Sequence, residues 1–186
     1  MANFEENLLS IIQKYTENFN CKSFSEESEE IDVLMEAFGI TQDLKKKNKQ
    51  YWGRQLGMCW QLLVTEVFRN YCEDFRPAKK YDDDEPADFF VGKEAFDTKY
   101  RVGSGDSGTL KKFKKYGEML SGEQLKPVIL ILRTDNLHSA ISAFKVGGWE
   151  IYTGDSSFNY IKNKTGFDLK EWLITLKDNG KHKIEK

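Results

Sequence analysis

An α/β fold, in which a mixed β-sheet is flanked by helices, is predicted by three features of the sequence. Val128-Ile-Leu-Ile-Leu132 is an unbroken apolar run, which is typical of a central strand covered on both faces. Residues 88–97 form a pattern of two short strands joined by a tight turn at Gly92-Lys93. Several stretches carry apolar residues at helical spacing, most strongly between Leu56 and Tyr71. Helices on both faces of one sheet would bury all of these stripes.

The other elements follow from the same periodicities. The first fifty residues are predicted to be mostly helical, and residues 51–186 to form the α/β core of the same single domain. The expected helices are residues 4–19, 31–38, 56–71, 108–120, 136–145, 155–163 and 168–177, and the expected strands are 87–91, 94–102, 128–132 and 149–153. Leu169, Trp172 and Leu173 are expected to face inward from the last helix.

Composition indicates a globular protein without a membrane partner. The chain has 186 residues, 39% of them hydrophobic, which is enough to bury a sizeable core. It contains no stretch of about 18 apolar residues, and its first residues lack the basic and apolar regions of a signal peptide, so we expect a cytoplasmic protein. Cys21, Cys59 and Cys72 have no C-x-x-C spacing, which argues against a disulfide framework and a zinc site.

Charge is distributed unevenly along the chain. Acidic residues concentrate in Glu26–Glu30 and Asp82–Glu85, and basic residues in Lys45–Lys49, Lys111–Lys115 and the tail from Lys181. The formal net charge is −2. Neutralisation of phosphates supplies most non-specific affinity for nucleic acid, so this balance is poorly suited to gripping DNA unaided.

The hairpin sets two carboxylates opposite each other. If Gly92 and Lys93 are the central turn residues, then Phe89 faces Phe96 and Asp88 faces Asp97. Side chains on a strand alternate, so Lys99 projects from the same face as Asp97. Like charges directly opposite each other are destabilising, and a cation is therefore expected there. Two convergent carboxylates are suited to hold Mg²⁺, and a neighbouring ammonium to orient an attacking water.

These residues resemble a known family. Pro86-Ala-Asp88, then Asp97-Thr-Lys99 followed by a helix, is similar to the motif of the PD-(D/E)xK nuclease superfamily, whose core is a mixed sheet flanked by helices. The resemblance implies cleavage of DNA phosphodiesters with Mg²⁺, with Asp88 and Asp97 as metal ligands and Lys99 as the motif lysine. Two details depart from the pattern: Ala87 separates the proline from the aspartate, and the second acid is Asp where Glu is commoner.

A wider resemblance covers nearly the whole chain. The run from Asp97 to Phe113, Leu130–Leu137 and Gly147-Gly-Trp149 resemble Type II restriction endonucleases, in particular the small catalytic subunits of heterodimeric Type IIS enzymes. This resemblance implies that a larger nicking subunit reads the sequence of double-stranded DNA and cuts one strand, while a chain like this one cuts the other. The length leaves no room for a separate recognition domain, in agreement with that division of labour.

A third carboxylate is predicted on the upstream helix. The 100° helical step places Glu66 on the flank of the apolar stripe, beside Cys59 and Leu63. Many restriction nucleases use an upstream helical glutamate in the metal site, so the resemblance implies this role for Glu66. A solvated helix flank is the alternative.

The turn after the hairpin predicts contacts with DNA. Gly103-Ser-Gly-Asp-Ser-Gly108 leads into a basic helix, with Ser107 as its expected N-cap. Backbone amides and lysines there are suited to phosphates. The candidate DNA-binding residues are Arg101, Ser104, Ser107, Lys111, Lys112 and Arg133. Lys112 and Tyr116 share the helix face that is expected to point toward the site.

Two other interpretations stay open. The chain could be a non-catalytic interaction subunit that keeps the hairpin only as structure. Gly103–Gly108 also spells G-x-G-x-x-G, as in dinucleotide-binding turns, although the preceding strand is too charged for a buried first strand. Two histidines cannot supply a histidine metal triad, and no G-x-S-x-G or P-loop motif is present.

Overall fold

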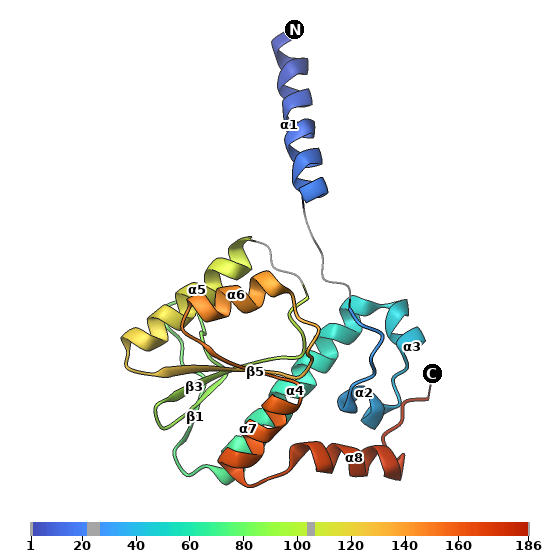
Figure 1. Ribbon diagram of the computed structural model, residues 1–186, viewed down its shortest axis with the longest axis vertical. Coiled ribbons are helices and arrows are strands. Elements are labelled where there is room, and N and C mark those ends of the chain that lie inside the picture. Colours follow the sequence, from blue (N-terminus) through green and yellow to red (C-terminus); the bar gives the residue numbers. More distant parts are fainter. Residues whose placement is uncertain (1, 22–26, 104–106, 186) are drawn as a thin grey trace.

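The computed structural model describes residues 2–21, 27–103 and 107–185, with side chains in the first helix described from 8 to 17. Figure 1 shows a layered α/β body from which the first helix projects. The helices are α1 (Ala2–Cys21), α2 (Val33–Phe38), α3 (Gln42–Lys47), α4 (Lys49–Tyr71), α5 (Ser107–Gly122), α6 (His138–Val146), α7 (Asp155–Thr165) and α8 (Leu169–Asn179). The strands are β1 (Phe75–Pro77), β2 (Phe89–Val91), β3 (Glu94–Lys99), β4 (Lys126–Ile131) and β5 (Glu150–Thr153). The predicted mixed sheet flanked by helices is confirmed.

The five strands lie in the order β1-β2-β3-β4-β5. β1, β2 and β3 are antiparallel, whereas β3, β4 and β5 are parallel. β1 and the short helix α3 were not predicted, because three to six residues carry too little periodicity to be recognised. The strand predicted for 94–102 ends at Lys99, although the Tyr100 carbonyl still accepts from Arg133 N at 3.0 Å.

The hairpin has the predicted register. Phe89 pairs with Phe96 and Val91 with Glu94. Gly92 has φ of 54°, while Lys93 is not in the left-handed region, as a type II′ turn requires. Asp88 lies just before β2, and its backbone N–H donates to Phe96 O at 2.7 Å. The regular ladder ends at the Phe89–Phe96 pair, so the predicted pair of Asp88 and Asp97 is not part of it, and the backbone of Asp88 lies beside Phe96 instead.

Each face of the sheet is covered by its own core. Phe89, Phe96 and Leu130 pack with α2, α4, α7 and α8 on one side. Ala95 and Ile129 pack with α5 and α6 on the other. Residues 128–131 of β4 are all fully buried, which confirms the sequence-based prediction of a central strand covered on both faces.

α4 is the helix that lies closest to the two strands of the hairpin. The Asn48 side chain caps its start by accepting from Tyr51 N at 3.1 Å. Its buried residues recur at helical spacing: Leu56, Trp60, Val64, Val67 and Phe68. Trp60 Nε1 also donates to Leu130 O at 3.1 Å, which fixes the helix against the middle of the sheet.

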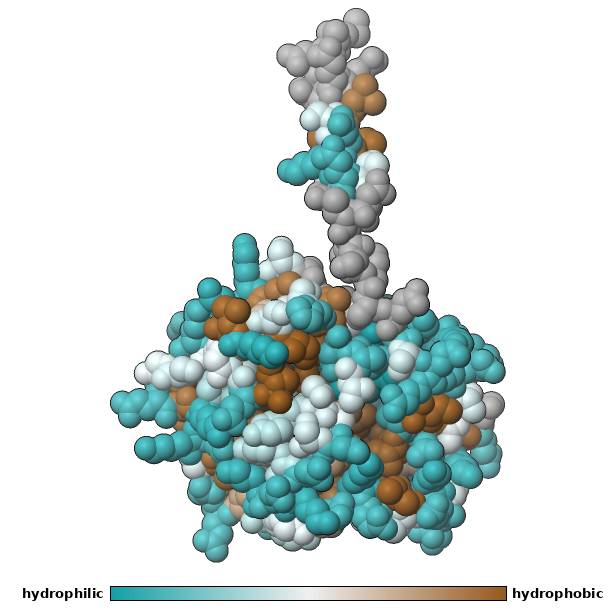
Figure 2. Space-filling view, in the orientation of Figure 1, coloured by the Kyte–Doolittle hydropathy of each residue, from teal (hydrophilic) through white to brown (hydrophobic). Residues whose placement is uncertain are grey.

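α1 has no apolar surface buried against the body in its described side chains. Figure 2 shows brown apolar side chains on its described part, and Leu9 and Ile12 are 67% and 65% exposed. Within the described residues no helix is both long and apolar enough to cross a membrane. In the last helix, Leu169 and Leu173 are buried as expected, but Trp172 is 38% exposed; its indole lies at the edge of the stripe, so the inward prediction was wrong for that residue.

Candidate active site

The candidate site lies where β2 begins and β3 ends, at one end of the sheet. Asp88 precedes β2, and Asp97, Thr98 and Lys99 close β3. Because the two strands are antiparallel, these positions meet at the same end. Thr98 is buried, whereas the side chain of Asp97 is 14% exposed and that of Lys99 36% exposed.

One backbone N–H joins the two carboxylates. Thr98 N donates to Asp88 Oδ2 at 2.8 Å and to Asp97 Oδ1 at 3.0 Å. The Thr98 hydroxyl donates to Asp88 Oδ2 at 2.7 Å. Lys99 Nζ donates to Asp97 Oδ1 at 2.6 Å. The sequence-predicted trio of Asp88, Asp97 and Lys99 is therefore brought together, with Thr98 as the shared donor.

Gln61 of α4 is the helical residue that reaches the cluster. Its Nε2 donates to Asp88 Oδ1 at 2.6 Å, while Thr98 engages the other carboxylate oxygen. An ionised carboxylate only accepts hydrogen bonds, so the amide nitrogen must face it. Sequence reasoning missed Gln61 because it searched the helix for acids, although a position just after buried Trp60 already predicts the edge of the packed face.

The negative charge of the two aspartates favours binding of a proton or a cation at the site. Burial, and then the charge of Asp97, raise the pKa of Asp88 to about 6, against the opposing effect of Lys99. Burial alone would lower the pKa of Lys99, but the charges of Asp97 and Asp88 outweigh it and leave that pKa above its ordinary value. Lys99 is consequently an ammonium at neutral pH, and two carboxylates share this single cation.

Glu66 is not brought to this cluster. Its side chain is 59% exposed, accepts from Arg69 Nη1 at 2.5 Å and accepts from Asn70 Nδ2 at 2.7 Å. Five residues separate it from Gln61, which is a turn of about 140° around the helix axis. Glu66 thus lies on a solvated helix flank, which was the alternative considered from the sequence.

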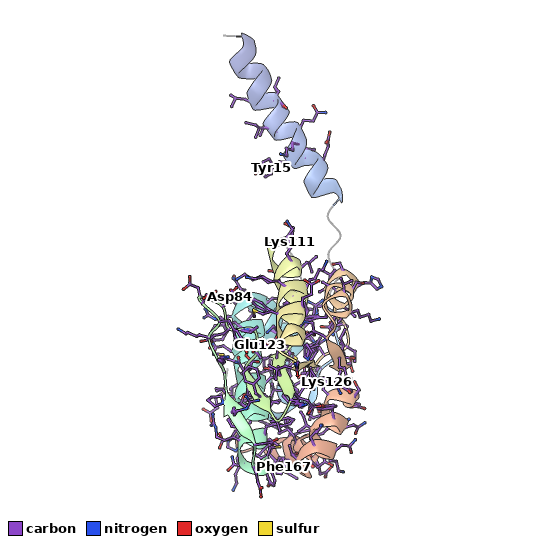
Figure 3. The ribbon with its side chains drawn as sticks, turned by 90° about the vertical axis from the view of Figure 1, so that its left-hand side faces the viewer. Tyr15, Asp84, Lys111, Glu123, Lys126 and Phe167 are labelled. Atoms are coloured by element: carbon purple, nitrogen blue, oxygen red, sulfur yellow. The ribbon has the colours of Figure 1, made fainter. Side chains whose placement is uncertain are left out.

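The basic helix α5 lies beside the site but engages an acidic loop. Lys112 Nζ is 3.6 Å from Asp84 Oδ1, Lys115 Nζ is 3.0 Å from Asp84 Oδ2, and the Tyr116 hydroxyl donates to Asp84 at 2.7 Å. Figure 3 shows Asp84 and Glu123 beside this helix, with Lys111 at its first turns. Burial and Asp84 raise the pKa of Tyr116 to about 12, and the charge of Asp97 contributes. The Tyr116 hydroxyl contacts Asp84, so its predicted orientation toward the site stays a prediction.

Of the other predicted DNA contacts, Arg133 is buried within the protein, whereas the side chain of Arg101 is partly exposed and pairs with Asp135. Arg133 is 3% exposed, and its three nitrogens donate to Asp32, Asp135, Ser28 and the Glu30 carbonyl. Arg101 Nε donates to Asp135 at 3.1 Å. These contacts give Arg133 an internal structural role.

The helix-terminal candidates have varied outcomes. Lys111 and Ser107 are exposed. Ser107 is the first residue of α5, so it lies one position inside the helix from its expected N-cap place. Ser104 lies outside the described residues, as does part of Gly103–Gly108, so the dinucleotide-binding interpretation is not addressed by the geometry.

A buried polar network beside the site was not predicted at all. Lys45 is 2% exposed and pairs with Glu27. Its Nζ also donates to the Tyr100 hydroxyl at 2.9 Å. The Tyr100 hydroxyl in turn donates to Asp32, which also pairs with Arg133. Lysine in a basic run is normally solvated, and nothing in the local sequence marks Lys45 as the one that folds inward.

The donor set of the site is suited to a hard divalent cation. Asp88 and Asp97 supply carboxylate oxygens, which Mg²⁺ prefers while it keeps several waters. Among the described residues, no group of three or more His, Cys, Asp or Glu side chains is close enough to hold a metal. A cation here would therefore be bound by two acids, solvent and substrate.

Comparison of the chain with protein-family models, curated proteins and solved structures finds no match. The interpretation of the site accordingly depends on its own geometry and chemistry.

Proposed function

We propose that the protein hydrolyses phosphodiester bonds of DNA with Mg²⁺, at the cluster of Asp88, Asp97 and Lys99. The observation that carries this proposal is the single Thr98 N–H shared by two carboxylates, with Lys99 Nζ 2.6 Å from one of them. A structural hairpin gains nothing from placing two acids against one cation, since like charges are destabilising. A metal-dependent phosphodiesterase needs that excess of negative charge.

Each side chain has a distinct task in the proposed reaction. Asp88 and Asp97 hold Mg²⁺, and Thr98 and Gln61 fix the orientation of the Asp88 carboxylate. When bound, the metal supplies positive charge for the phosphate and lowers the pKa of water. Lys99, an ammonium at neutral pH, orients the attacking water and stabilises the charge that develops on the phosphate oxygens.

We propose further that the chain acts as the small catalytic subunit beside a larger, DNA-recognising nicking subunit. The net charge of −2 supports this division, because it limits the chain's own electrostatic affinity for duplex DNA, and a partner that reads the sequence would supply the rest. Each subunit would then cut one strand of the duplex.

The proposal is tested by calorimetric titration of Mn²⁺ into the wild type, Asp97→Asn and Glu66→Gln, because metal binding does not need the partner. We expect saturable binding by the wild type, loss of at least about tenfold in affinity for Asp97→Asn, and wild-type binding for Glu66→Gln. Equal titration of all three proteins, or no binding by the wild type with duplex DNA present, would contradict the nuclease.

The second candidate function, a non-catalytic interaction subunit, is favoured by α1. Leu8, Ile11 and Tyr15 on this helix are 47%, 53% and 54% exposed, as on a surface that binds another protein. Metal binding separates the two functions. An interaction subunit would keep its partner affinity in Asp97→Asn and would show no metal titration to lose.

A further inference from the structure

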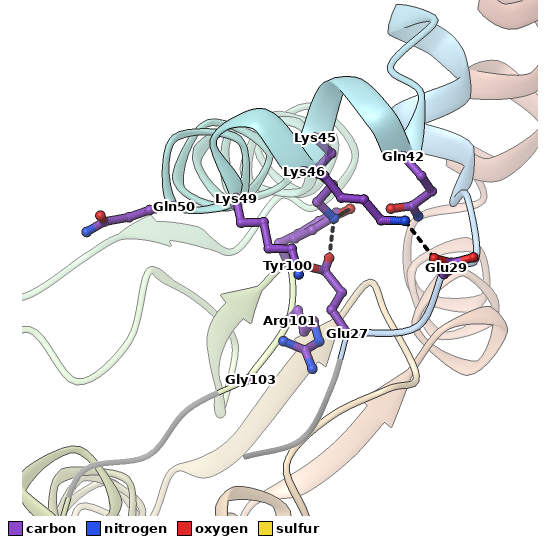
Figure 4. Close-up of a pocket in the computed structure, with 11 residues that line it drawn as sticks. Glu27, Glu29, Gln42, Lys45, Lys46, Lys49, Gln50, Tyr100, Arg101 and Gly103 are labelled. Atoms are coloured by element: carbon purple, nitrogen blue, oxygen red, sulfur yellow. Dashed lines mark hydrogen bonds and ion pairs between the residues drawn. The ribbon is translucent and has the colours of Figure 1, made fainter.

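A charged cleft of about 740 Å³ lies next to the candidate site. Figure 4 shows its wall of lysines from α3 and the start of α4, facing Tyr100 and Arg101. Both residues directly follow Lys99 in the chain, so the cleft opens at the end of β3 that carries the candidate site.

The cleft has an inner and an outer pair of charges. The inner pair, Lys45 with Glu27, has side chains 2% and 15% exposed and belongs to the buried network. In the outer pair, Lys46 Nζ lies 2.6 Å from Glu29 Oε1, with side chains 47% and 80% exposed. The inner pair is structural, whereas the outer pair faces solvent and can exchange its partner.

Glu29 can leave Lys46 without disturbing the backbone that carries it. The neighbouring Ser28 is fixed, because its N–H donates to Asp135 at 2.8 Å and its hydroxyl accepts from Arg133 at 2.9 Å. Only the exposed Glu29 side chain has to rotate, and an exposed ion pair contributes little to stability because solvent screens it. An incoming phosphate would thus displace Glu29 at little cost.

We propose that this cleft binds the sugar-phosphate backbone of DNA next to the scissile phosphate, through Lys46 and Lys49, and that Glu29 occupies the position of a phosphate when DNA is absent. The inference rests on the proposed function for the direction in which the strand runs, but DNA binding in the cleft is measured without metal and without cleavage.

Gly53 offers a probe that leaves the fold intact. It lines the cleft from α4, and a Cβ added there would meet no atom within 4 Å. Gly53→Glu and Gly53→Gln place side chains of equal size in the cleft and differ only in charge. Both replace a helical glycine by a better helix former, so neither is expected to unfold the protein.

The experiment measures anisotropy of a fluorescent duplex of about 20 base pairs in EDTA at about 50 mM salt, where electrostatic contacts dominate. We expect Gly53→Glu to weaken binding about five- to tenfold relative to Gly53→Gln, and Glu29→Gln to strengthen it about threefold. Glu171→Gln, an equal change of net charge on α8 outside the cleft, controls for the global field. Lys49→Ala should reduce the salt slope by about one.

Three results would overturn the inference: equal affinity of Gly53→Glu and Gly53→Gln, an equal gain from Glu29→Gln and Glu171→Gln, or no binding by either the wild type or Glu29→Gln. If any of these occurs while Mn²⁺ binding depends on Asp97, the proposal of DNA binding in the cleft is wrong and the proposal of nuclease activity is retained. If the cleft variants behave as expected but no metal binds, the nuclease fails and the chain is a DNA-binding subunit.

Discussion

Two charge clusters lie side by side at the end of β3, and they are built on opposite principles. In the buried network, the anions Glu27, Asp32 and Asp135 are matched by the cations Lys45, Arg133 and Arg101. In the candidate site, Lys99 pairs with Asp97 and is the cation whose charge also acts on Asp88. Tyr100 alone separates Lys99 from Arg101 in the chain, so the difference is not one of location. A balanced cluster, which has equal numbers of anions and cations, stabilises the fold. A cluster with an excess of anions leaves negative charge that a cation could neutralise.

The pKa directions follow this contrast. Burial would raise the pKa of Asp135, but hydrogen bonds from Arg133 and Ser28 outweigh burial and leave it below the ordinary range. The pKa of Asp88 rises to about 6, because burial and Asp97 outweigh Lys99 and Thr98. Ionisation of Asp135 therefore stabilises the folded state, whereas ionisation of Asp88 destabilises it.

The largest expected effect comes from removing the central cation of the balanced cluster. Arg133→Met would leave Asp32 and Asp135 without their partner in a buried setting, and should cost about 3–5 kcal/mol of unfolding free energy. Urea unfolding measures it. Lys177→Met is the matched control, because its pair with Glu36 is exposed and screened by solvent, so its loss should change the unfolding free energy far less. Similar losses in both variants would show that burial of the network is not what makes it strong.

The second prediction is that removing a charge from the candidate site raises the unfolding free energy. Asp88→Asn keeps an oxygen that accepts from Thr98 but removes the charge, so at pH 7 it should stabilise the metal-free protein by up to about 3 kcal/mol. A carboxyl whose folded pKa is raised costs stability above that pKa and costs none below its unfolded pKa. The gain should therefore grow between about pH 4 and 6 and stay constant above.

Asp135→Asn is the matched variant for this test. A lowered folded pKa contributes stability at neutral pH that is lost in acid, so Asp135→Asn should destabilise the protein at pH 7 and converge with the wild type at low pH. Thermal unfolding across this range measures both. If the two asparagine variants shift stability in the same direction, the contrast between the clusters does not hold.

The same contrast explains what could be predicted from the sequence. The hairpin register, the buried strand β4 and the meeting of Asp88, Asp97 and Lys99 follow from local patterns: a two-residue turn, a run of apolar residues and strand alternation. The balanced network joins residues about a hundred positions apart in the chain, and no local pattern records which lysine or arginine turns inward.

The side chain of α4 that reaches the site could not be predicted from local sequence patterns. Glu66 and Gln61 both lie near the edge of the α4 stripe, and the chemistry of the acid favoured Glu66. The structure selects Gln61, because the direction in which the helix crosses the start of β2 depends on packing of Trp60 and Phe68 against the sheet. Periodicity identifies a helix face but not the strand end beneath it.

The smallest expected effects test that pair of positions. Gln61→Glu would place a third carboxylate beside Asp88, and should lower the stability of the metal-free protein by about 1–2 kcal/mol through repulsion. The same change adds an anionic oxygen to the proposed metal site, so Mn²⁺ affinity should rise about tenfold. Unfolding with and without Mn²⁺ measures both effects, because bound metal stabilises the folded state in proportion to its affinity.

Glu66→Gln should change stability by less than about 0.5 kcal/mol and leave Mn²⁺ affinity unaltered, since its carboxylate is exposed and paired with Arg69 on the helix surface. The opposite ranking, with Glu66→Gln weakening the metal and Gln61→Glu without effect, would mean that α4 rotates about its axis when the cation binds. That result would make Glu66 a third carboxylate ligand of the proposed site while keeping Asp88 and Asp97 in place.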